Sequence, residues 1–229
     1  MSVVERVNKA WDRIEAWYKT TFPDWTPNAG ASEADIAALE KDMGITFPEE
    51  LRVSLKRHNG IEDGKWPRGG LLNLAEIREE WNTWTDMARN DELDDDGVET
   101  DGTFQQKWWC ESWIPIDQDG GGNFHMIDLL PGTKGRKGQV LYFYHETGPE
   151  KSKYPDYIGY LETVADGFEK GKYTIEESGI YDNEADGEEG EGDEGDEEGE
   201  GDEGDEEDEE EDEEDEEEEK SKNKKKVKK

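Results

Sequence analysis

The glycine-rich stretch GGGNFHMIDLLPGTKGRKGQVLYF at residues 120–143 carries imidazole and basic side chains, the residue types of phosphate loops, metal sites and hairpins. A phosphate loop of the Walker type needs G-x-x-x-x-G-K-[ST] followed by a helix, whose N-terminus holds the anion. Here GTKGRKG leads instead into VLYFYH, a pattern typical of a strand. The stretch therefore does not indicate a nucleotide site, and no cofactor is predicted.

A calcium loop fits the spacing of the same region better. Asp117, Asp119 and Asp128 fall at positions 1, 3 and 12 of such a loop, and Gly122 falls at its glycine position 6. Gly121, however, offers no ligand at position 5, and the predicted flanks are strands rather than helices. We interpret the segment as a glycine-rich turn whose aspartates bond neighbouring backbone amides, and we predict no tight calcium binding.

A second metal hypothesis uses His125 and His145, which lie near each other if the two flanking segments form a hairpin. A register that pairs Leu129 with Val140 places His125 opposite Tyr144, so the two imidazoles are offset. No C-x-x-C or H-x-x-x-H spacing supports a metal site. We predict that the histidines are paired or exposed side chains and not ligands.

Nucleophilic catalysis finds no support in the sequence. Cys110 and Ser112 lack an activating motif such as G-x-S-x-G, and His58 lies in a different predicted element. The carboxylates are too numerous to single out an acid–base pair. The sequence therefore predicts a protein without catalytic activity.

Composition divides the 229 residues into a folded part and an acidic tail. All 23 aromatic residues lie in residues 1–183, which carry a net charge of −16. Residues 184–229 hold 28 acidic and 7 basic residues and only two apolar side chains. Because such a segment cannot offset its conformational entropy, we predict one domain over residues 1–183 and a disordered tail over residues 184–229.

The net charge of −37 excludes whole classes of partner. Phosphates repel an acidic domain, so we expect neither nucleic acid nor an anionic membrane to bind it directly. The last ten residues, KSKNKKKVKK, reverse the sign, and three roles stay open for them: pairing with the acidic tail, contact with nucleic acid, or a nuclear localisation signal, whose motif is weak. A single cysteine, a charged N-terminal stretch and no long apolar run favour a cytoplasmic protein.

Helices dominate the first half of the predicted fold. Apolar residues recur at helical spacing over residues 2–19, where Ser2 and Glu5 form a capping box. Ser32 caps a second helix that ends at Gly44. Further helices are predicted from Pro48 to about residue 58, over residues 73–88 with Asn73 and Glu76 as its cap, and over residues 156–170.

Further along the chain, the spacing of apolar residues changes from helical to alternating. SWIPI (112–116), FHMIDL (124–129) and QVLYFYH (139–145) read as strands, and another strand is predicted within 173–182. An irregular acidic stretch over residues 89–107 separates them from the preceding helix. Helices followed by sequential strands and a last helix predict an α+β domain with four to five helices on one antiparallel sheet.

The strand region resembles the signature of the SMI1/KNR4 family, also called the SUKH superfamily. WIPI at residues 113–116 matches its W-[IL]-P-[IL] strand, and later pieces match its G-N turn, D-L strand, P-G pair and G-x-x-G-Q-V sequence. The residues that carry these later pieces are Gly122, Asn123, Asp128, Leu129, Pro131, Gly132, Gly135, Gly138, Gln139 and Val140.

Upstream segments resemble the same family. FPEEL at residues 47–51 corresponds to its L-P-E-E-L landmark with Phe in place of Leu, and HNG at 58–60 corresponds to its H-N-G landmark. The match runs in order over about residues 8–172 and leaves out the acidic tail. We read the motif residues as turn-forming positions: Gly122, Asn123, Asp128, Pro131, Gly132, Gly138 and Gln139.

The resemblance implies a non-enzymatic protein-binding module with no catalytic or metal residue. Bacterial members are mostly immunity proteins that bind toxins, many of them nucleases, and this role is the first expectation. Fungal members regulate cell-wall synthesis through protein partners, which gives the regulatory alternative. An undetected hydrolase or metal-dependent enzyme is the third alternative.

A basic partner such as a toxin nuclease would meet an acidic surface with complementary potential. The candidate surface lies in the irregular acidic stretch, where binding residues often sit. Its residues are Asp91, Glu92, Asp94, Asp95, Asp96, Glu99 and Asp101. The alternative interpretation of this stretch is a solvated, flexible loop.

Overall fold

The computed structural model of the protein describes residues 1–176 and 179–182, all within one compact unit. The α+β fold class is confirmed, with five α-helices and antiparallel sheets among these residues. The helices are α1 (Val3–Thr21), α2 (Glu33–Met43), α3 (Glu49–Arg57), α4 (Leu74–Arg89) and α5 (Tyr157–Lys170). The predicted acidic tail lies outside the described residues, so the boundary at residue 183 stays a prediction.

The helix boundaries follow the predicted caps. Ser2 and Asn73 form capping boxes at the starts of α1 and α4, and Ser32 caps α2. Gly44 ends α2 in the left-handed conformation, with φ of 68°. Pro48 differs from the prediction because it lies at the N-cap of α3 and not inside its first turn. Among the described residues, no helix combines the length and apolar content needed to cross a membrane.

The prediction of one antiparallel sheet is wrong, because the described strands form three separate sheets. β1 (Ile61–Trp66), β2 (Gly69–Leu71) and β4 (Asp117–Gln118) form the first. The second has the order β3 (Trp113–Pro115), β5 (Phe124–Asp128), β6 (Gln139–Tyr144) and β7 (Gly148–Lys151). The third is the hairpin of β8 (Tyr173–Glu176) and β9 (Gly179–Asp182).

Strands β1, β2, β4 and β7 were absent from the sequence prediction for a physical reason. The centre of β1 reads Glu-Asp-Gly-Lys and β7 reads Gly-Pro-Glu-Lys, which contain none of the β-branched or aromatic residues that mark strands. Tertiary pairing with stronger neighbours supplies these strands: β7 pairs along the edge of β6, and β4 pairs with β2. Local propensity alone does not detect them.

The register of the central hairpin differs by two residues from the one assumed above for the two histidines. Ile127, not Leu129, pairs with Val140, and His125 therefore faces Tyr142 instead of Tyr144. This register stacks Phe124 on Phe143, with ring centroids 4.7 Å apart. The shift by an even number keeps the same face inward, so burial does not distinguish the two registers.

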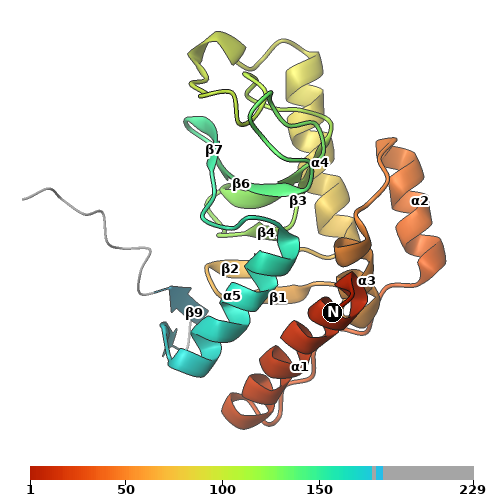
Figure 1. Ribbon diagram of the computed structural model, residues 1–229, viewed down its shortest axis with the longest axis vertical. Coiled ribbons are helices and arrows are strands. Elements are labelled where there is room, and N and C mark those ends of the chain that lie inside the picture. The colour runs from red at the N-terminus through yellow and green to blue at the C-terminus, as the bar shows by residue number, and fades with distance from the viewer. Residues whose placement is uncertain (177–178, 183–229) are drawn as a thin grey trace, which may run out of the picture. The chain divides into compact units, whose positions relative to one another are not determined.

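The helices cover the sheets from different sides (Figure 1). α4 packs along β3, and its Trp84 meets Phe143 of β6 edge to face, with ring centroids 4.5 Å apart. α1 and α5 lie side by side and also contact α3. Between them lies a core of large aromatic side chains that includes the fully buried Trp11, Trp66 and Tyr157. These three helices therefore enclose much of the aromatic core.

Candidate interaction surfaces

The acidic loop, defined here as residues 91–101, is anchored to the domain through some of its own carboxylates. Asp94 accepts a hydrogen bond from the Asp96 backbone N–H at 3.2 Å and caps the short 3₁₀ turn Asp95–Gly97. Asp95 accepts from the Trp108 backbone N–H at 2.8 Å and from Lys107 Nζ at 2.9 Å. The loop also buries Val98. These contacts attach part of the loop to the domain, and both interpretations, a partner surface and a solvated, flexible loop, stay open.

Asp101 fastens the other end of the acidic loop. Its carboxylate accepts from the Thr103 hydroxyl at 2.6 Å and from Lys151 Nζ in β7 at 2.5 Å. The hydrogen bonds from Lys151 and Thr103 hold the pKa of Asp101 well below its ordinary value. The carboxylate is therefore charged at neutral pH and partly neutralised by its partner.

The remaining carboxylates of the acidic loop point outward without such support. Asp91, Glu92, Asp96 and Glu99 are exposed, and their side chains have no hydrogen-bond or ion-pair partner among the described residues. Asp91 adopts a left-handed backbone with φ of 55°, which turns the chain out of α4. Of the seven predicted partner-binding residues, these four are the ones left available to a partner.

The basic loop, residues 130–138, packs against residues 102–104, which directly follow the acidic loop. Gly132 N donates to the Thr103 carbonyl at 3.0 Å, and Lys134 N donates to the Gly102 carbonyl at 2.8 Å. A Cβ on Gly135 would lie 1.9 Å from the Thr103 carbonyl oxygen, so only glycine fits there. The motif glycines are therefore needed for close backbone approach as well as for turning.

The three cations at this loop differ in their environment. Arg136 donates to the Pro155 carbonyl at 2.5 Å and contacts the Asp156 carboxylate at 3.2 Å, which ties it to the start of α5. Lys134 and Lys137 are exposed, with no side-chain partner among the described residues. The predicted basic tip thus consists of two lysines, because Arg136 is engaged.

Asn123 connects the turn before β5 to the end of β6. Its amide N–H₂ donates to Asp119 at 2.7 Å, and its oxygen accepts from the His145 backbone N–H at 3.0 Å. Asp119 in turn accepts from the backbone N–H groups of Gly121 and Asn123. Gly122, with φ of 90°, completes this turn, as predicted for a turn-forming residue.

The assignment of Asp128 and Gln139 to turns is wrong, because each residue lies buried in a strand. Asp128 accepts from Trp113 Nε1 at 3.0 Å and from Gln139 Nε2 at 2.9 Å. Burial raises the pKa of Asp128 although these bonds favour the charged form. Gln139 Nε2 also donates to the Thr103 carbonyl at 3.0 Å, so one amide joins the sheet to the acidic loop's end.

A second buried carboxylate forms a network that the sequence analysis missed. Asp117 accepts from the His125 backbone N–H at 2.5 Å, from His125 Nδ1 at 2.7 Å and from the Tyr160 hydroxyl at 2.6 Å. Tyr160 itself accepts from Trp66 Nε1 at 2.6 Å. The network joins β1, β4, β5 and α5, and its members lie up to 94 residues apart in sequence, which hides them from any local motif.

Attraction decides the charge of Asp117. Burial opposes its charged form, but the charge and hydrogen bonds of His125, with the Tyr160 hydroxyl, hold the pKa of Asp117 below its ordinary value. The three aspartates of the hypothetical calcium loop thus each serve a separate hydrogen-bond network. Among the described residues, no group of three His, Cys, Asp or Glu side chains has the arrangement of a metal site.

The other residues that were considered for catalysis or metal binding have ordinary structural environments. His58 Nε2 lies 2.8 Å from a Glu15 carboxylate oxygen, and its Nδ1 lies 3.0 Å from the Asn28 carbonyl oxygen. His145 Nδ1 lies 2.9 Å from the Asn123 side-chain oxygen. Burial raises the pKa of the Cys110 thiol, which disfavours the nucleophilic thiolate. This geometry assembles no nucleophile and base among the residues described.

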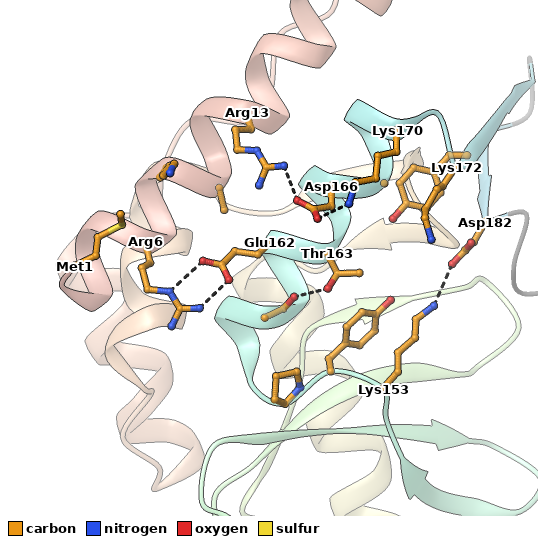
Figure 2. Close-up of a pocket in the computed structure, with 17 residues that line it drawn as sticks. Met1, Arg6, Arg13, Lys153, Glu162, Thr163, Asp166, Lys170, Lys172 and Asp182 are labelled. Atoms are coloured by element: carbon orange, nitrogen blue, oxygen red, sulfur yellow. Dashed lines mark hydrogen bonds and ion pairs between the residues drawn. The ribbon is translucent and has the colours of Figure 1, made fainter.

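A groove of about 720 Å³ lies along the seam between α1 and α5 and reaches β9 (Figure 2). Its charged lining comprises six basic and three acidic side chains: Arg6, Lys9, Arg13, Lys153, Lys170 and Lys172, with Glu162, Asp166 and Asp182. No local sequence pattern marks this surface, because its residues come from both ends of the domain.

Ion pairs between the helices cross the floor of the groove. Arg6 binds Glu162 through two hydrogen bonds of 3.0 and 2.7 Å, and Arg13 contacts Asp166 at 2.6 Å. Hydrogen bonds from Lys170 and Arg13 lower the pKa of Asp166 to about 2. Each exposed pair adds little stability, but together they set the alignment of α1 on α5.

Comparisons with known proteins agree with this architecture. The model of the SMI1/KNR4 family (SUKH-1) matches residues 30–171. The cell wall biosynthesis/cell cycle regulator smi1 of Schizosaccharomyces pombe is 29% identical over 190 aligned positions, which cover 75% of this chain and 38% of the relative. The glucan synthesis regulatory protein of Neurospora crassa is 26% identical over 212 positions, which cover 75% and 40%.

A budding-yeast relative carries a similar name. The cell wall assembly regulator SMI1 of Saccharomyces cerevisiae is 23% identical over 175 aligned positions, which cover 58% of this chain and 35% of the relative. The chain thus matches less than half the length of each of these three relatives.

Proposed function

Because this chain belongs to the SMI1/KNR4 family (SUKH-1), we propose that it is a regulatory protein-binding module that acts in the assembly of the cell wall. The observation that carries this proposal is the family match over residues 30–171 together with the names of three fungal relatives, all of which describe regulators. Those relatives are named as regulators and not as enzymes.

The comparisons favour the regulatory alternative over the immunity role that was expected first. None of the relatives named above is described as an immunity protein, and their names refer to cell wall or glucan. The chain matches less than half of each relative, so activities of their remaining segments are not assigned to it. The proposal is limited to the partner-binding role of the shared domain.

We assign the partner contact to the four outward carboxylates of the acidic loop, Asp91, Glu92, Asp96 and Glu99. Their support is geometric: they are exposed and unpaired among the described residues, on a loop that Asp94, Asp95 and Asp101 hold in place. A held loop loses less conformational entropy when it binds. The partner should present a basic surface, with the charges acting mainly on the rate of association.

Complementation tests this function directly. The full chain would be expressed in Schizosaccharomyces pombe cells that lack the smi1 relative, and the resistance of the cell wall to glucanase digestion would be measured. Restored resistance supports a regulatory role in the cell wall. No restoration by a chain that accumulates in folded form would contradict the proposal.

The contact surface is tested with matched variants in the same cells. Asp91→Asn, Asp96→Asn and Glu99→Gln together remove three outward charges, and Asn suits the left-handed backbone at position 91. The control removes three exposed, unpaired charges elsewhere, at Asp24, Glu49 and Glu79. We expect the loop variant alone to lose complementation. Equal behaviour of the two variants would exclude the acidic loop as the contact surface.

A further inference from the structure

The groove between α1 and α5 has the opposite charge to the domain that contains it. Its lining carries a net charge of +3, whereas residues 1–183 carry −16. Glu169 lies outside the lining and accepts two hydrogen bonds from Arg13, which reduces the local positive excess without cancelling it. A positive groove on an acidic domain is therefore a local feature that fits an acidic occupant.

At least one cation of the groove is open to such an occupant. Lys9 is exposed on α1, and its side chain has no hydrogen-bond or ion-pair partner among the described residues. Lys170 is exposed and shares Asp166 with Arg13. Lys153 lies 3.7 Å from Asp182, a loose contact compared with the other pairs of the groove. A carboxylate can approach these amines without breaking the inter-helix pairs.

The chain supplies an acidic segment at the rim of this groove. Asp182, which lines the groove, is the last described residue, and residues 183–189 follow with the sequence NEADGEE. This stretch holds four carboxylates and no cation. Extended at about 3.3 Å per residue, it spans roughly 23 Å, close to the roughly 21 Å length of the 14-residue helix α5. Length and starting point both suit the groove.

We propose that the groove between α1 and α5 seats the acidic stretch 183–189 of the same chain. The tether makes this association intramolecular, with an effective concentration on the order of millimolar for a short flexible connection. Individually weak ion pairs therefore suffice to populate the seated state at low salt. Seating partly neutralises the stretch and closes the groove to other anionic segments. The proposal is independent of the regulatory function proposed above.

Carbodiimide cross-linking of the full chain tests the proposal, because the reagent joins a lysine amine to a touching carboxylate through an amide bond. At about 0.01 M salt we expect links from Lys9 and Lys170 to Glu184, Asp186, Glu188 or Glu189. The yield should fall several-fold at about 1 M salt, where the Debye length drops from roughly 30 Å to about 3 Å. Lys19, exposed on α1 outside the groove, is the internal reference.

A matched pair of variants locates the attraction. Lys9→Glu reverses one charge inside the groove and should reduce the links that Lys170 makes to residues 183–189 several-fold. Lys19→Glu makes the same change on the same helix outside the groove and should leave those links intact. Thermal unfolding of both variants checks that the fold is retained. Equal reduction in the two variants would overturn the proposal.

Mixing chains labelled with ¹⁵N and unlabelled chains separates the possible occupants. Links within one chain support the proposal. Links that join labelled to unlabelled chains would assign the groove to a second copy, and links only to carboxylates beyond residue 190 would assign it to a later acidic run. Yields at Lys9 no higher than at Lys19 would show that the groove has no acidic occupant. Each of these last three results contradicts the proposal.

Discussion

Asp117 and Asp96 are the same residue type in two regions of this domain, yet they have opposite roles. Asp117 is only 4% exposed and accepts three hydrogen bonds that join β4 and β5 to α5. Asp96 lies on the acidic loop, exposed, with no side-chain partner among the described residues. The difference shows that a count of acidic residues says little about function until each carboxylate is placed.

The acidic loop repeats this contrast within a few residues. The carboxylates of Asp95 and Asp101 accept hydrogen bonds from within the domain, while the side chains of Asp91 and Glu99 are exposed. A loop built this way presents charge from a defined backbone. The buried carboxylates stabilise the fold, and the outward ones are those for which we propose a role in recognition. Graded substitutions can test this division.

The largest effect is expected at the buried network. In Asp117→Asn, the amide N–H₂ must face at least one of the donors from His125 or Tyr160, which leaves a buried donor unpaired. We expect a loss of about 3 kcal/mol or more in the free energy of unfolding, measured by urea denaturation. Asp96→Asn is the matched control and should stay within about 0.5 kcal/mol of the wild-type chain. Similar losses in both variants would erase the distinction between the two regions.

The same network predicts a pH dependence. The pKa of Asp117 is lower in the folded state than in the unfolded state, where an aspartate has a pKa of about 3.9. Its contribution to stability is therefore fully present above that value and is lost as pH falls through the folded pKa. The wild-type chain should lose stability towards low pH more steeply than Asp117→Asn. Acid-unfolding curves of equal steepness for the two chains would show that the Asp117 carboxylate does not contribute this pH dependence of stability.

An intermediate effect is expected where the basic loop meets the end of the acidic loop. In Gly135→Ala the new Cβ would clash with the Thr103 carbonyl oxygen, and the backbone must shift. We expect a loss of about 1–3 kcal/mol in unfolding free energy, with faster hydrogen exchange at the Lys134 amide. Gly121→Ala is the control, because its nearest neighbour is the Asp119 side chain at 3.3 Å and its φ is not left-handed. Unchanged exchange at Lys134 would show that the two loops are not coupled.

The predictable part of the fold was local. Helix starts at Ser2, Ser32 and Asn73 were predicted correctly because capping boxes and apolar spacing lie within a few residues of each other. Strands β1 and β7 were missed because their pairing partners, rather than their own side chains, place them in sheets. The register of the central hairpin could not be derived from burial, since registers that differ by an even number of residues bury the same face of the strand.

In the candidate site, too, only the local features could be predicted from the sequence. The acidic run at residues 91–101 is visible in the sequence, but which carboxylates are engaged depends on Lys107, Trp108 and Lys151. The glycines at 132 and 135 were expected to turn the chain, whereas their contact with residues 102–104 requires knowledge of a distant backbone. The groove between α1 and α5 joins residues about 150 positions apart, as Arg6 and Glu162 do, and no local pattern reveals it.

The smallest and sharpest test compares two neighbouring carboxylates of the acidic loop. Asp95→Ala and Asp96→Ala change the net charge equally, but only Asp95 accepts hydrogen bonds from the Trp108 backbone and from Lys107. We expect Asp95→Ala to cost about 1 kcal/mol in unfolding free energy and Asp96→Ala less than about 0.5 kcal/mol. In the complementation assay we expect Asp96→Ala to weaken function because it removes an outward charge, although the variant retains its stability. If Asp96→Ala were instead the less stable variant, the loop would not rest on Asp95, and the separation of anchoring from recognising carboxylates would fail.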